Sequence, residues 1–359
     1  MKKAIITGGG SGGHVFPALA VAKLLKAAGF EAVFAGTAEG IEKQAAEKEG
    51  LRFVAIASGK FYRRLTLRNI ASIYKVIKGV GDSMRMLAAE KPDVVIGFGG
   101  YVSFPVVVSA RLLGIKTALH EQNVFPGLAN RFLSRFVALT LMTFADAGIK
   151  LGGRKVLTGI PVRSRIGQAD REAALKSLGL NSGLKTVAVV GGSLGGRGLN
   201  KAVIEALPYL KEKNIQLVWV TGLSDFSKCN EAGKRADFTV VTAPFIERIE
   251  EVYAAADLMV IRCGASLVFE ALKCALPSVL VPFPYSAADH QKYNAGFVAG
   301  NGAGVMLQEK ELSGGLLAET ITGLLGDEKK LKEMSAAAKR LYGKDAGPEI
   351  IQAIKGLVC

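Results

Sequence analysis

The chain has 359 residues and a formal net charge of +15, with 46 Lys and Arg against 31 Asp and Glu. Because a single hydrophobic core stops growing at roughly 250–300 residues, two domains are expected. No apolar run approaches the ~18 residues of a membrane span, and the apolar run after the basic start ends at Thr7, too early for a signal peptide. Four cysteines without zinc-type spacing predict reduced thiols in a cytoplasmic protein.

The positive charge is concentrated in the first half of the chain. Residues 1–160 carry 22 Lys and Arg against 10 Asp and Glu, or +12, whereas residues 161–359 carry 24 against 21, or +3. This asymmetry predicts an anionic partner for the first half. With one Trp, no RNP motif and no zinc finger, the sequence argues against nucleic acid and favours an anionic membrane surface.

Short apolar, β-branched runs alternate with segments of helical periodicity. This alternation predicts an α/β fold in which parallel sheets are covered by helices. Gly159–Arg163 interrupts the pattern and is the expected hinge, and residues 347–359 are expected to form a last amphipathic helix. The expected strands are Ala4–Thr7, Ala32–Ala35, Val94–Gly97, Thr117–Leu119, Val156–Thr158, Thr186–Val190, Gln216–Thr221, Phe238–Val241, Leu258–Ile261 and Ser278–Val281.

Two of these strands open onto a glycine-rich loop that is followed by a helix, at Gly8–His14 and at Gly191–Gly196. Glycines let the backbone approach a phosphate, and the start of the helix offers unpaired N–H groups. The first loop satisfies G-x-G-x-x-G, but the second strand ends Phe34–Thr37 without the acid that a dinucleotide ribose requires. The pattern therefore predicts twin Rossmann-like domains that bind some other phosphate.

The stretch from Lys60 to Arg85 combines cations with an apolar stripe. Ile70, Ile73, Tyr74, Ile77, Val80 and Met84 recur at three- and four-residue steps, as on one face of a helix. One interpretation is a helix packed on its own sheet, and the other is a face that contacts a membrane. Seven basic residues accompany the single acid Asp82: Lys60, Arg63, Arg64, Arg68, Lys75, Lys78 and Arg85.

Two residues are candidates for chemistry on their position alone. His14 follows the first glycine loop at the start of a helix, which disfavours its cationic form and leaves it able to accept a proton. Glu270 lies one turn inside the helix after Gly264, where a carboxylate can accept both hydroxyls of a ribose. The alternatives are a loop histidine that only caps or packs and a solvated helix acid. No D-x-D occurs, so no metal site is expected.

Six motifs follow one another along the chain, at Gly9–Ala20, Gly99–Tyr101, His120–Gly127, Gly159–Arg163, Gly191–Asn200 and Arg262–Ala295. Taken together, they resemble glycosyltransferase family 28, a family that includes the N-acetylglucosamine transferases of peptidoglycan synthesis. The similarity runs nearly end to end, and it implies a GT-B fold with two Rossmann-like domains. It implies an acceptor and membrane-associating domain at 1–160, a nucleotide-sugar domain at 161–342, and a helix at 343–359 that packs back on the first.

The resemblance also implies roles for individual residues. His14 or Glu121 would be the catalytic base, and the residues alone leave the choice between them open. Leu267 departs from the threonine usual in the family, and Ser266 carries the neighbouring hydroxyl. The implied acceptor-binding residues are Ser11, Gly12, Gly13, Tyr101 and Asn123. The implied donor-binding residues are Arg163, Ser193, Ile246, Ala265, Ser266, Leu267, Glu270, His290 and Gln291.

The implied reaction is inverting transfer of N-acetylglucosamine from UDP-N-acetylglucosamine to the 4-hydroxyl of the N-acetylmuramic acid of lipid I, giving lipid II. The resemblance implies that no cofactor is required. It implies a peripheral position on the cytoplasmic face of the membrane, with cell-wall synthesis proteins as further partners. Two other functions fit the same fold: a UDP-N-acetylglucosamine 2-epimerase, and a sugar-nucleotide-binding module without catalysis.

Overall fold

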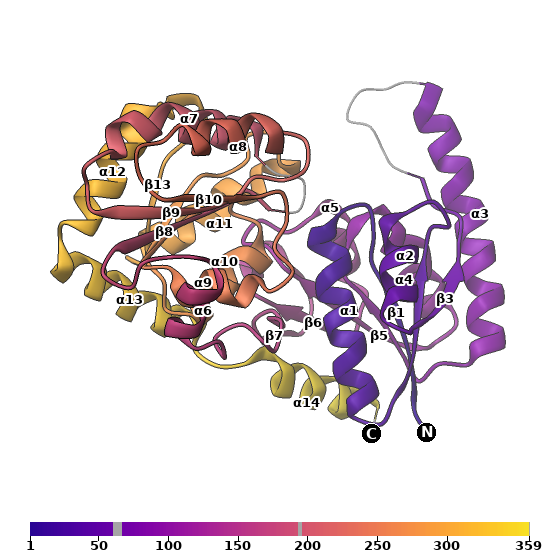
Figure 1. Ribbon diagram of the computed structural model, residues 1–359. Helices are drawn as coiled ribbons and strands as arrows, with labels where there is room; N and C mark the ends of the chain where they lie inside the picture. Colours follow the sequence, from indigo (N-terminus) through magenta and orange to yellow (C-terminus); the bar gives the residue numbers. More distant parts are fainter. Residues whose placement is uncertain (60–66, 193–195, 359) are drawn as a thin grey trace. The chain divides into compact units, whose positions relative to one another are not determined.

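The computed structural model describes residues 1–59, 67–192 and 196–358, with only the backbone of 67–69. Contacts divide the chain into two compact units, Met1–Pro161 with Lys344–Cys359, and Val162–Gly343. Each unit is a parallel α/β sandwich, as Figure 1 shows. No helix within the described residues combines the length and apolar composition needed to span a bilayer.

The first unit is built on a sheet of seven parallel strands in the order β3-β2-β1-β4-β5-β6-β7. The strands are β1 (Lys3–Thr7), β2 (Glu31–Gly36), β3 (Arg52–Ala55), β4 (Val94–Gly97), β5 (Lys116–Glu121), β6 (Leu139–Met142) and β7 (Lys155–Leu157). The helices are α1 (Gly12–Ala27), α2 (Ile41–Lys48), α3 (Leu67–Glu90), α4 (Gly100–Leu112), α5 (Leu128–Leu133) and α14 (Ala346–Val358), with a 3-10 turn at Ala145–Lys150.

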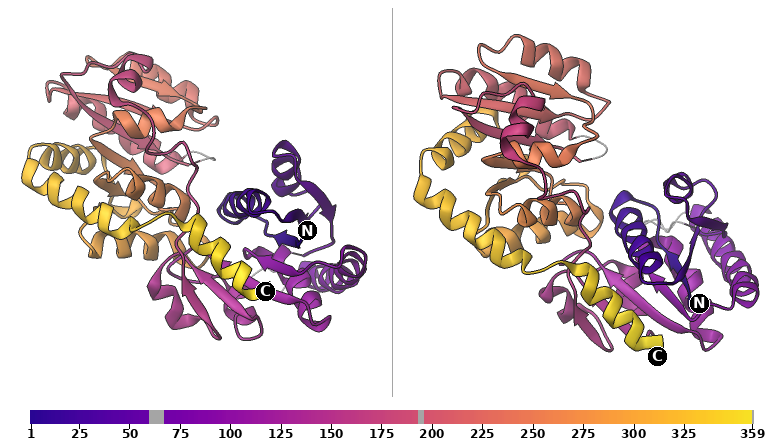
Figure 2. Two further views of the ribbon diagram at one scale, coloured as in Figure 1. Left: turned by 90° about the horizontal axis from the view of Figure 1, so that it is seen from below. Right: turned by 60° about the horizontal axis from the view of Figure 1, so that its bottom comes forward.

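Both faces of this sheet are buried, which explains the continuous apolar runs of its strands. On one face Ile6, Phe34 and Ile96 pack with residues of α1 and α14. On the other, Ile5, Val33 and Val95 pack with residues of α3 and α4. The last helix is part of this unit, because Ile350 and Ile354 are fully buried in its core (Figure 2).

The second unit repeats the design with six parallel strands in the order β10-β9-β8-β11-β12-β13. The strands are β8 (Lys185–Val190), β9 (Ile215–Val220), β10 (Val240–Ala243), β11 (Leu258–Ile261), β12 (Ser278–Leu280) and β13 (Gly304–Met306). The helices are α6 (Arg171–Ser177), α7 (Arg197–Leu210), α8 (Phe226–Lys234), α9 (Ile249–Ala255), α10 (Ala265–Lys273), α11 (His290–Gly300), α12 (Gly314–Leu325) and α13 (Glu328–Tyr342), with 3-10 turns at Ala287–Asp289 and Glu309–Glu311.

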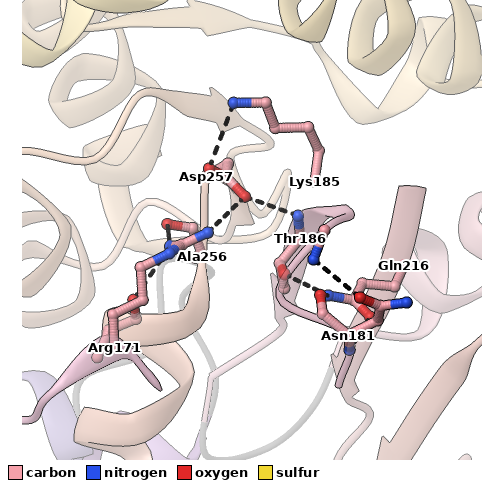
Figure 3. A network of polar contacts seen from close by, with 9 residues as sticks. Arg171, Asn181, Lys185, Thr186, Gln216, Ala256 and Asp257 are labelled. Carbon is pink, nitrogen blue, oxygen red and sulfur yellow. Dashed lines mark hydrogen bonds and ion pairs between the residues drawn. The ribbon is translucent and has the colours of Figure 1, made fainter. Parts of the chain in front are cut away.

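A polar network ties the amino ends of the central strands of the second unit together (Figure 3). Asp257, which precedes β11, accepts from the Thr186 backbone N–H at 2.8 Å and from Arg171 at 2.9 Å. Gln216 on β9 donates to Thr186 Oγ1 at 2.9 Å. These hydrogen bonds stabilise the sheet. Because they lie at the amino ends of the strands, opposite the glycine loop, the carboxyl ends remain available for a functional site.

The predicted α/β fold with parallel sheets is confirmed, but three strands were not predicted from the sequence: β3, β6 and β13. Two of them, β3 and β13, are edge strands, and each pairs with a single neighbour. The third, β6, is four residues long and fully buried. Their short runs form strands because an adjacent strand offers a ladder of backbone partners, which sequence periodicity does not reveal.

Candidate functional site

In the first unit, three loops meet at the carboxyl ends of adjacent strands β1, β4 and β5. The first glycine loop lies against α4, where a Cβ added to Gly10 would stand 2.8 Å from the ring of Tyr101. A Cβ at Gly100 would lie 2.3 Å from the carbonyl oxygen of Gly9. These glycines are therefore required for the loops to approach each other. Ser11 immediately precedes α1, and Gly12 and Gly13 begin it, as an anion site at a helix start requires.

His14 lies at the centre of this loop cluster. Its ring packs over the start of α4, since added Cβ atoms at Gly99 and Gly100 would each stand 3.3 Å from an imidazole carbon. Its Nδ1 lies 3.1 Å from Oε1 of Gln122, which follows β5. The side chain is half-buried, so the imidazole is held on one side and remains partly accessible on the other.

Both carboxylate oxygens of Glu121 accept hydrogen bonds from the segment that follows β5. Oε1 accepts from the backbone N–H of Asn123 at 2.9 Å and from its side-chain amide at 3.4 Å. Oε2 accepts from Asn130 Nδ2 at 2.9 Å and from the Gly127 N–H at 3.2 Å. Burial raises the pKa of this carboxyl, and the amide donors oppose that shift. Glu121 thus organises the segment that follows β5, with Asn123 as one of its partners.

In the second unit, the predicted donor residues lie along the carboxyl edge of the sheet. Ala265, Ser266 and Leu267 form the first turn of α10 after β11. Ile246 follows the edge strand β10, and His290 begins α11. The predicted residue Ser193, together with Leu194, lies outside the described residues.

Glu270 is buried, with 5% of its surface exposed, and is bound from two sides. Arg163 forms a bidentate pair with it, Nε to Oε1 and a terminal nitrogen to Oε2, both at 2.8 Å. The hydroxyl of Tyr253 on α9 also donates to Oε2 at 2.8 Å. Burial, followed by the charge of Glu270, raises the pKa of Tyr253 well above its ordinary value. The guanidinium of Arg163, one of the predicted donor-binding residues, thus lies on this carboxylate.

Amide side chains of α11 hold the loops that follow β11 and β12. Gln291 Oε1 accepts from the backbone N–H of Cys263 at 3.1 Å and of Phe283 at 2.9 Å. Asn294, which the sequence analysis did not single out, donates to the carbonyl of Cys263 at 3.0 Å. Two non-glycine residues here, Ala288 and Asp289, have φ of +53° and +54°. Such backbone strain clusters at ligand-binding loops.

Comparison with known proteins matches both halves of the chain to one family. The N-terminal domain model of glycosyltransferase family 28 matches residues 4–142, and the C-terminal domain model matches residues 186–350. The chain belongs to glycosyltransferase family 28.

Relatives within family 28 match over nearly the whole length. The UDP-N-acetylglucosamine–N-acetylmuramyl-(pentapeptide) pyrophosphoryl-undecaprenol N-acetylglucosamine transferase of Moorella thermoacetica is 41% identical, covering 98% of both chains. The transferase of the same name from Bacillus licheniformis is 39% identical, again covering 98% of each. The crystal structure of MurG from Acinetobacter baumannii superposes with a TM-score of 0.83 at 29% identity, covering 99% of this chain and 100% of that one.

The end of β2, which lacks the acid of a dinucleotide site, is instead contacted by an acid on α2. Glu42 on α2 reaches back to Thr37, accepting from its backbone N–H at 3.1 Å and its hydroxyl at 2.5 Å. The carboxyl is fully buried against Gly9, where an added Cβ would lie 2.8 Å from Oε1. Glu42 thus joins the loop after β2 to the first glycine loop. The signal available in the sequence was an acid at the start of a helix.

Arg262 plays a corresponding part beside the second glycine loop. Only 4% exposed, it donates to the carbonyls of Val281 and Pro282 and pairs with Glu309. Added Cβ atoms would stand 2.9 Å from Arg262 Nε at Gly196 and 2.2 Å from Glu309 Oε1 at Gly198. The pair of buried Arg262 and half-buried Glu309 therefore shapes the backbone that leads into α7. In the sequence, Arg262 stands out only as the first residue of the Arg262–Ala295 motif.

Proposed function

We propose that this chain transfers N-acetylglucosamine from UDP-N-acetylglucosamine to the 4-hydroxyl of the N-acetylmuramic acid of lipid I, with inversion, giving lipid II. The observation that carries the proposal is the His14 site, a histidine seated at a phosphate-type glycine loop in a chain that matches this transferase end to end. The substrates in this proposal are those in the names of the relatives, and the catalytic base is His14.

The two units would divide the substrates between them. In the first, Ser11, Gly12 and Gly13 would hold the diphosphate of lipid I, and Tyr101 and Asn123 would line its sugar. In the second, the first turn of α10 would meet the nucleotide phosphates, because a helix start offers N–H groups and a partial positive charge. Further donor contacts would come from Arg163, Ser193, Ile246, Glu270, His290 and Gln291.

The chemical step would be a single displacement. His14 Nε2 takes the proton of the acceptor 4-hydroxyl as that oxygen attacks C1 of the donor sugar. The new C1–O bond forms as the bond from C1 to the diphosphate oxygen breaks, and UDP leaves with the electron pair. The N–H groups at the start of α10, together with Arg163, stabilise the charge that develops on the leaving diphosphate. General-base catalysis of this kind typically contributes ~10²–10⁴ in rate.

One assay separates this function from its two rivals. Purified protein is incubated with UDP-N-acetylglucosamine, with and without a soluble lipid I analogue, and UDP and sugar products are measured. A transferase releases UDP in step with formation of the disaccharide, and only when the acceptor is present. Epimerised sugar without an acceptor would favour the 2-epimerase, and tight UDP binding without product would favour a binding module.

Transfer is expected to survive chelation of divalent ions by EDTA. The sequence lacks D-x-D, and in residues 1–59, 67–192 and 196–358 no group of three His, Cys, Asp or Glu is placed to hold an ion. Backbone N–H groups and Arg163 would stabilise the diphosphate charge instead. The rate is measured with EDTA and after addition of Mg²⁺ or Mn²⁺. Complete loss that a divalent ion restores would contradict this expectation.

The membrane surface that we propose lies on α3. Its inner side carries small residues: an added Cβ at Gly79 would stand 2.0 Å from the carbonyl oxygen of Ala57, and Ser83 is fully buried. The apolar stripe instead faces outward, with Ile73 49% and Ile77 66% exposed. Exposed cations, among them Lys75, lie on the same helix. Of the other cations of the stretch, Lys60, Arg63 and Arg64 lie outside the described residues, as does the side chain of Arg68.

This outward face favours peripheral docking at the cytoplasmic side of an anionic membrane, where the lipid-linked acceptor would be presented. Replacing Lys75 and Lys78 together by alanine should weaken binding to anionic vesicles by about 2 kcal/mol, at ~1 kcal/mol per cation. Separately, replacing Ile73 and Ile77 by serine should weaken binding without unfolding the protein, because both side chains are exposed. Vesicle sedimentation at low and high salt measures both effects.

The matched control changes two exposed lysines of the second unit, Lys329 and Lys332, to alanine. It removes the same charge from a different surface and should leave vesicle binding unchanged. Equal losses in both double variants would mean that net charge, rather than α3, governs attachment. Normal binding of the Ile73/Ile77 variant would remove the apolar stripe from the docking surface.

A further inference from the structure

A chain of hydrogen bonds runs within the first unit from His14 through Gln122 to His120 and the carbonyl of Gly159. His14 Nδ1 lies 3.1 Å from Gln122 Oε1. Gln122 Nε2 lies 2.9 Å from the carbonyl oxygen of His120 and 3.2 Å from its Nδ1. His120 Nε2 lies 3.0 Å from the Gly159 carbonyl oxygen. The residues come from α1, the end of β5, and the segment after β7.

The donor and the acceptor of each hydrogen bond in this series can be assigned by starting from the carbonyl of Gly159. A backbone carbonyl only accepts, so His120 must carry its proton on Nε2, and its Nδ1 then accepts from the Gln122 amide. Burial lowers the pKa of His120 to about 4, although the bond to Gly159 opposes this, so the ring is neutral at physiological pH. The amide nitrogen of Gln122 also donates to the carbonyl of His120, which turns Oε1 toward His14.

His14 can meet that amide oxygen only as a donor. Its proton therefore resides on Nδ1, and the lone pair of the neutral ring is on Nε2. A reversed amide would place Oε1 against two acceptors, the carbonyl oxygen and Nδ1 of His120, and with both residues at most 1% exposed no solvent would relieve that repulsion. Phe98 stacks on the His120 ring at 5.2 Å, and Asn130 donates to the carbonyl of His120 at 3.2 Å. Each side chain in this series of hydrogen bonds is therefore held in one orientation.

We propose that Gln122 is the positioning residue for the general base, selecting the tautomer of His14 that presents its lone pair on Nε2. This role rests on the transfer reaction proposed above, in which that nitrogen takes the acceptor proton. An amide achieves the selection without a charge. A carboxylate in its place would stabilise the imidazolium and hold the proton after transfer.

Other titratable groups lie on the elements that surround His14: Glu42 on α2, Tyr101 on α4, and His120 and Glu121 on β5. Of these, His120 is neutral and hydrogen-bonded through both ring nitrogens. Both carboxylate oxygens of Glu121 are occupied by amide donors. The Glu42 carboxyl is bound to Thr37. The group that meets His14 Nδ1 is an uncharged amide, which matches a role in orientation.

Nitrogen-15 NMR of the full chain labelled at histidine tests the proposal directly, because the protein has only three histidines. At neutral pH the unaltered protein should show His14 protonated on Nδ1 and His120 protonated on Nε2. Signals are assigned with His14→Gln and His290→Gln variants. Finding the His14 proton on Nε2 in the active, unaltered protein would overturn the role of Gln122, whether or not any variant folds.

The variant Gln122→Met keeps the length of the side chain and removes the amide. It should shift His14 toward the Nε2–H tautomer and lower kcat by about 10- to 100-fold, the range known for loss of the group that orients a metal-binding histidine. The KM for the donor should not change. Gln44→Leu, an exposed change on α2, is the matched control. A Gln122→Met protein with an unaltered tautomer and kcat would overturn the proposal. Transfer by the unaltered chain is measured first, so its absence would count against the proposed function alone.

Discussion

Replacing His14 by alanine should lower the rate of transfer by ~10²–10⁴, the range for loss of a general base. The affinity for UDP-N-acetylglucosamine should stay close to that of the unaltered protein, because the proposed donor residues belong to the second unit. The rate is measured with a soluble acceptor analogue, and donor affinity by calorimetry. This split between rate and donor affinity distinguishes loss of a base from general damage.

The companion variant Glu121→Gln addresses the other candidate base. Its two oxygens accept from Asn123, Gly127 and Asn130, and a neutral amide reproduces only part of this pattern. We expect a higher KM for the acceptor and lower stability, with a pH profile unchanged in shape. If the His14→Ala protein kept its kcat while Glu121→Gln lost it, the base would be Glu121.

The parts of the fold that could be predicted are those that depend on local pattern. The bounds of β4 and β11 agree with expectation because each is a short, fully buried apolar run between polar or glycine residues. In contrast, β3 has an exposed arginine at its start and half-buried residues at its centre, so nothing in its composition marks a strand. It forms because β2 lies beside it.

The outward stripe of α3 shows a second limit. Helical periodicity located the apolar residues correctly, but it does not say which side of a helix meets the protein. That choice follows from the fit of Gly79 against the carbonyl of Ala57, a contact between separate elements. Small residues allow this close approach, and the large isoleucines are left facing outward.

The candidate site, like the fold, could be predicted only in part. Motifs located His14 and Glu270, but they did not reveal the groups that hold them. Gln122 is 108 residues from His14, and Tyr253 lies on a different helix from Glu270. Such partners are defined by the packing of distant elements, so a single sequence without structure does not distinguish them from ordinary polar residues.

Replacing Glu270 by alanine should weaken UDP binding by about 1.5–3 kcal/mol, the range for hydrogen bonds to a charged group, or roughly 10- to 150-fold. The structure adds a condition to this prediction. The carboxylate is almost wholly covered by Arg163 and Tyr253, so a ribose reaches it only when Arg163 moves away. The side chain of Arg163 is 57% exposed, which leaves it able to turn toward a diphosphate. When a nucleotide binds, Glu270 would thus exchange Arg163 for the ribose, and Arg163 would exchange Glu270 for the diphosphate.

The same arrangement predicts two effects of the Glu270→Ala substitution that can be separated. The buried hydroxyl of Tyr253 loses its acceptor, which should cost about 1–3 kcal/mol of stability and lower the melting temperature. Arg163 regains solvent at little cost. The double variant Glu270→Ala/Tyr253→Phe removes the unpaired hydroxyl and should recover stability without recovering UDP affinity. Glu231→Ala, on an exposed face of α8, is the matched control. Calorimetry that finds unchanged UDP affinity in the folded Glu270→Ala protein would assign Glu270 to the structure of the second unit alone.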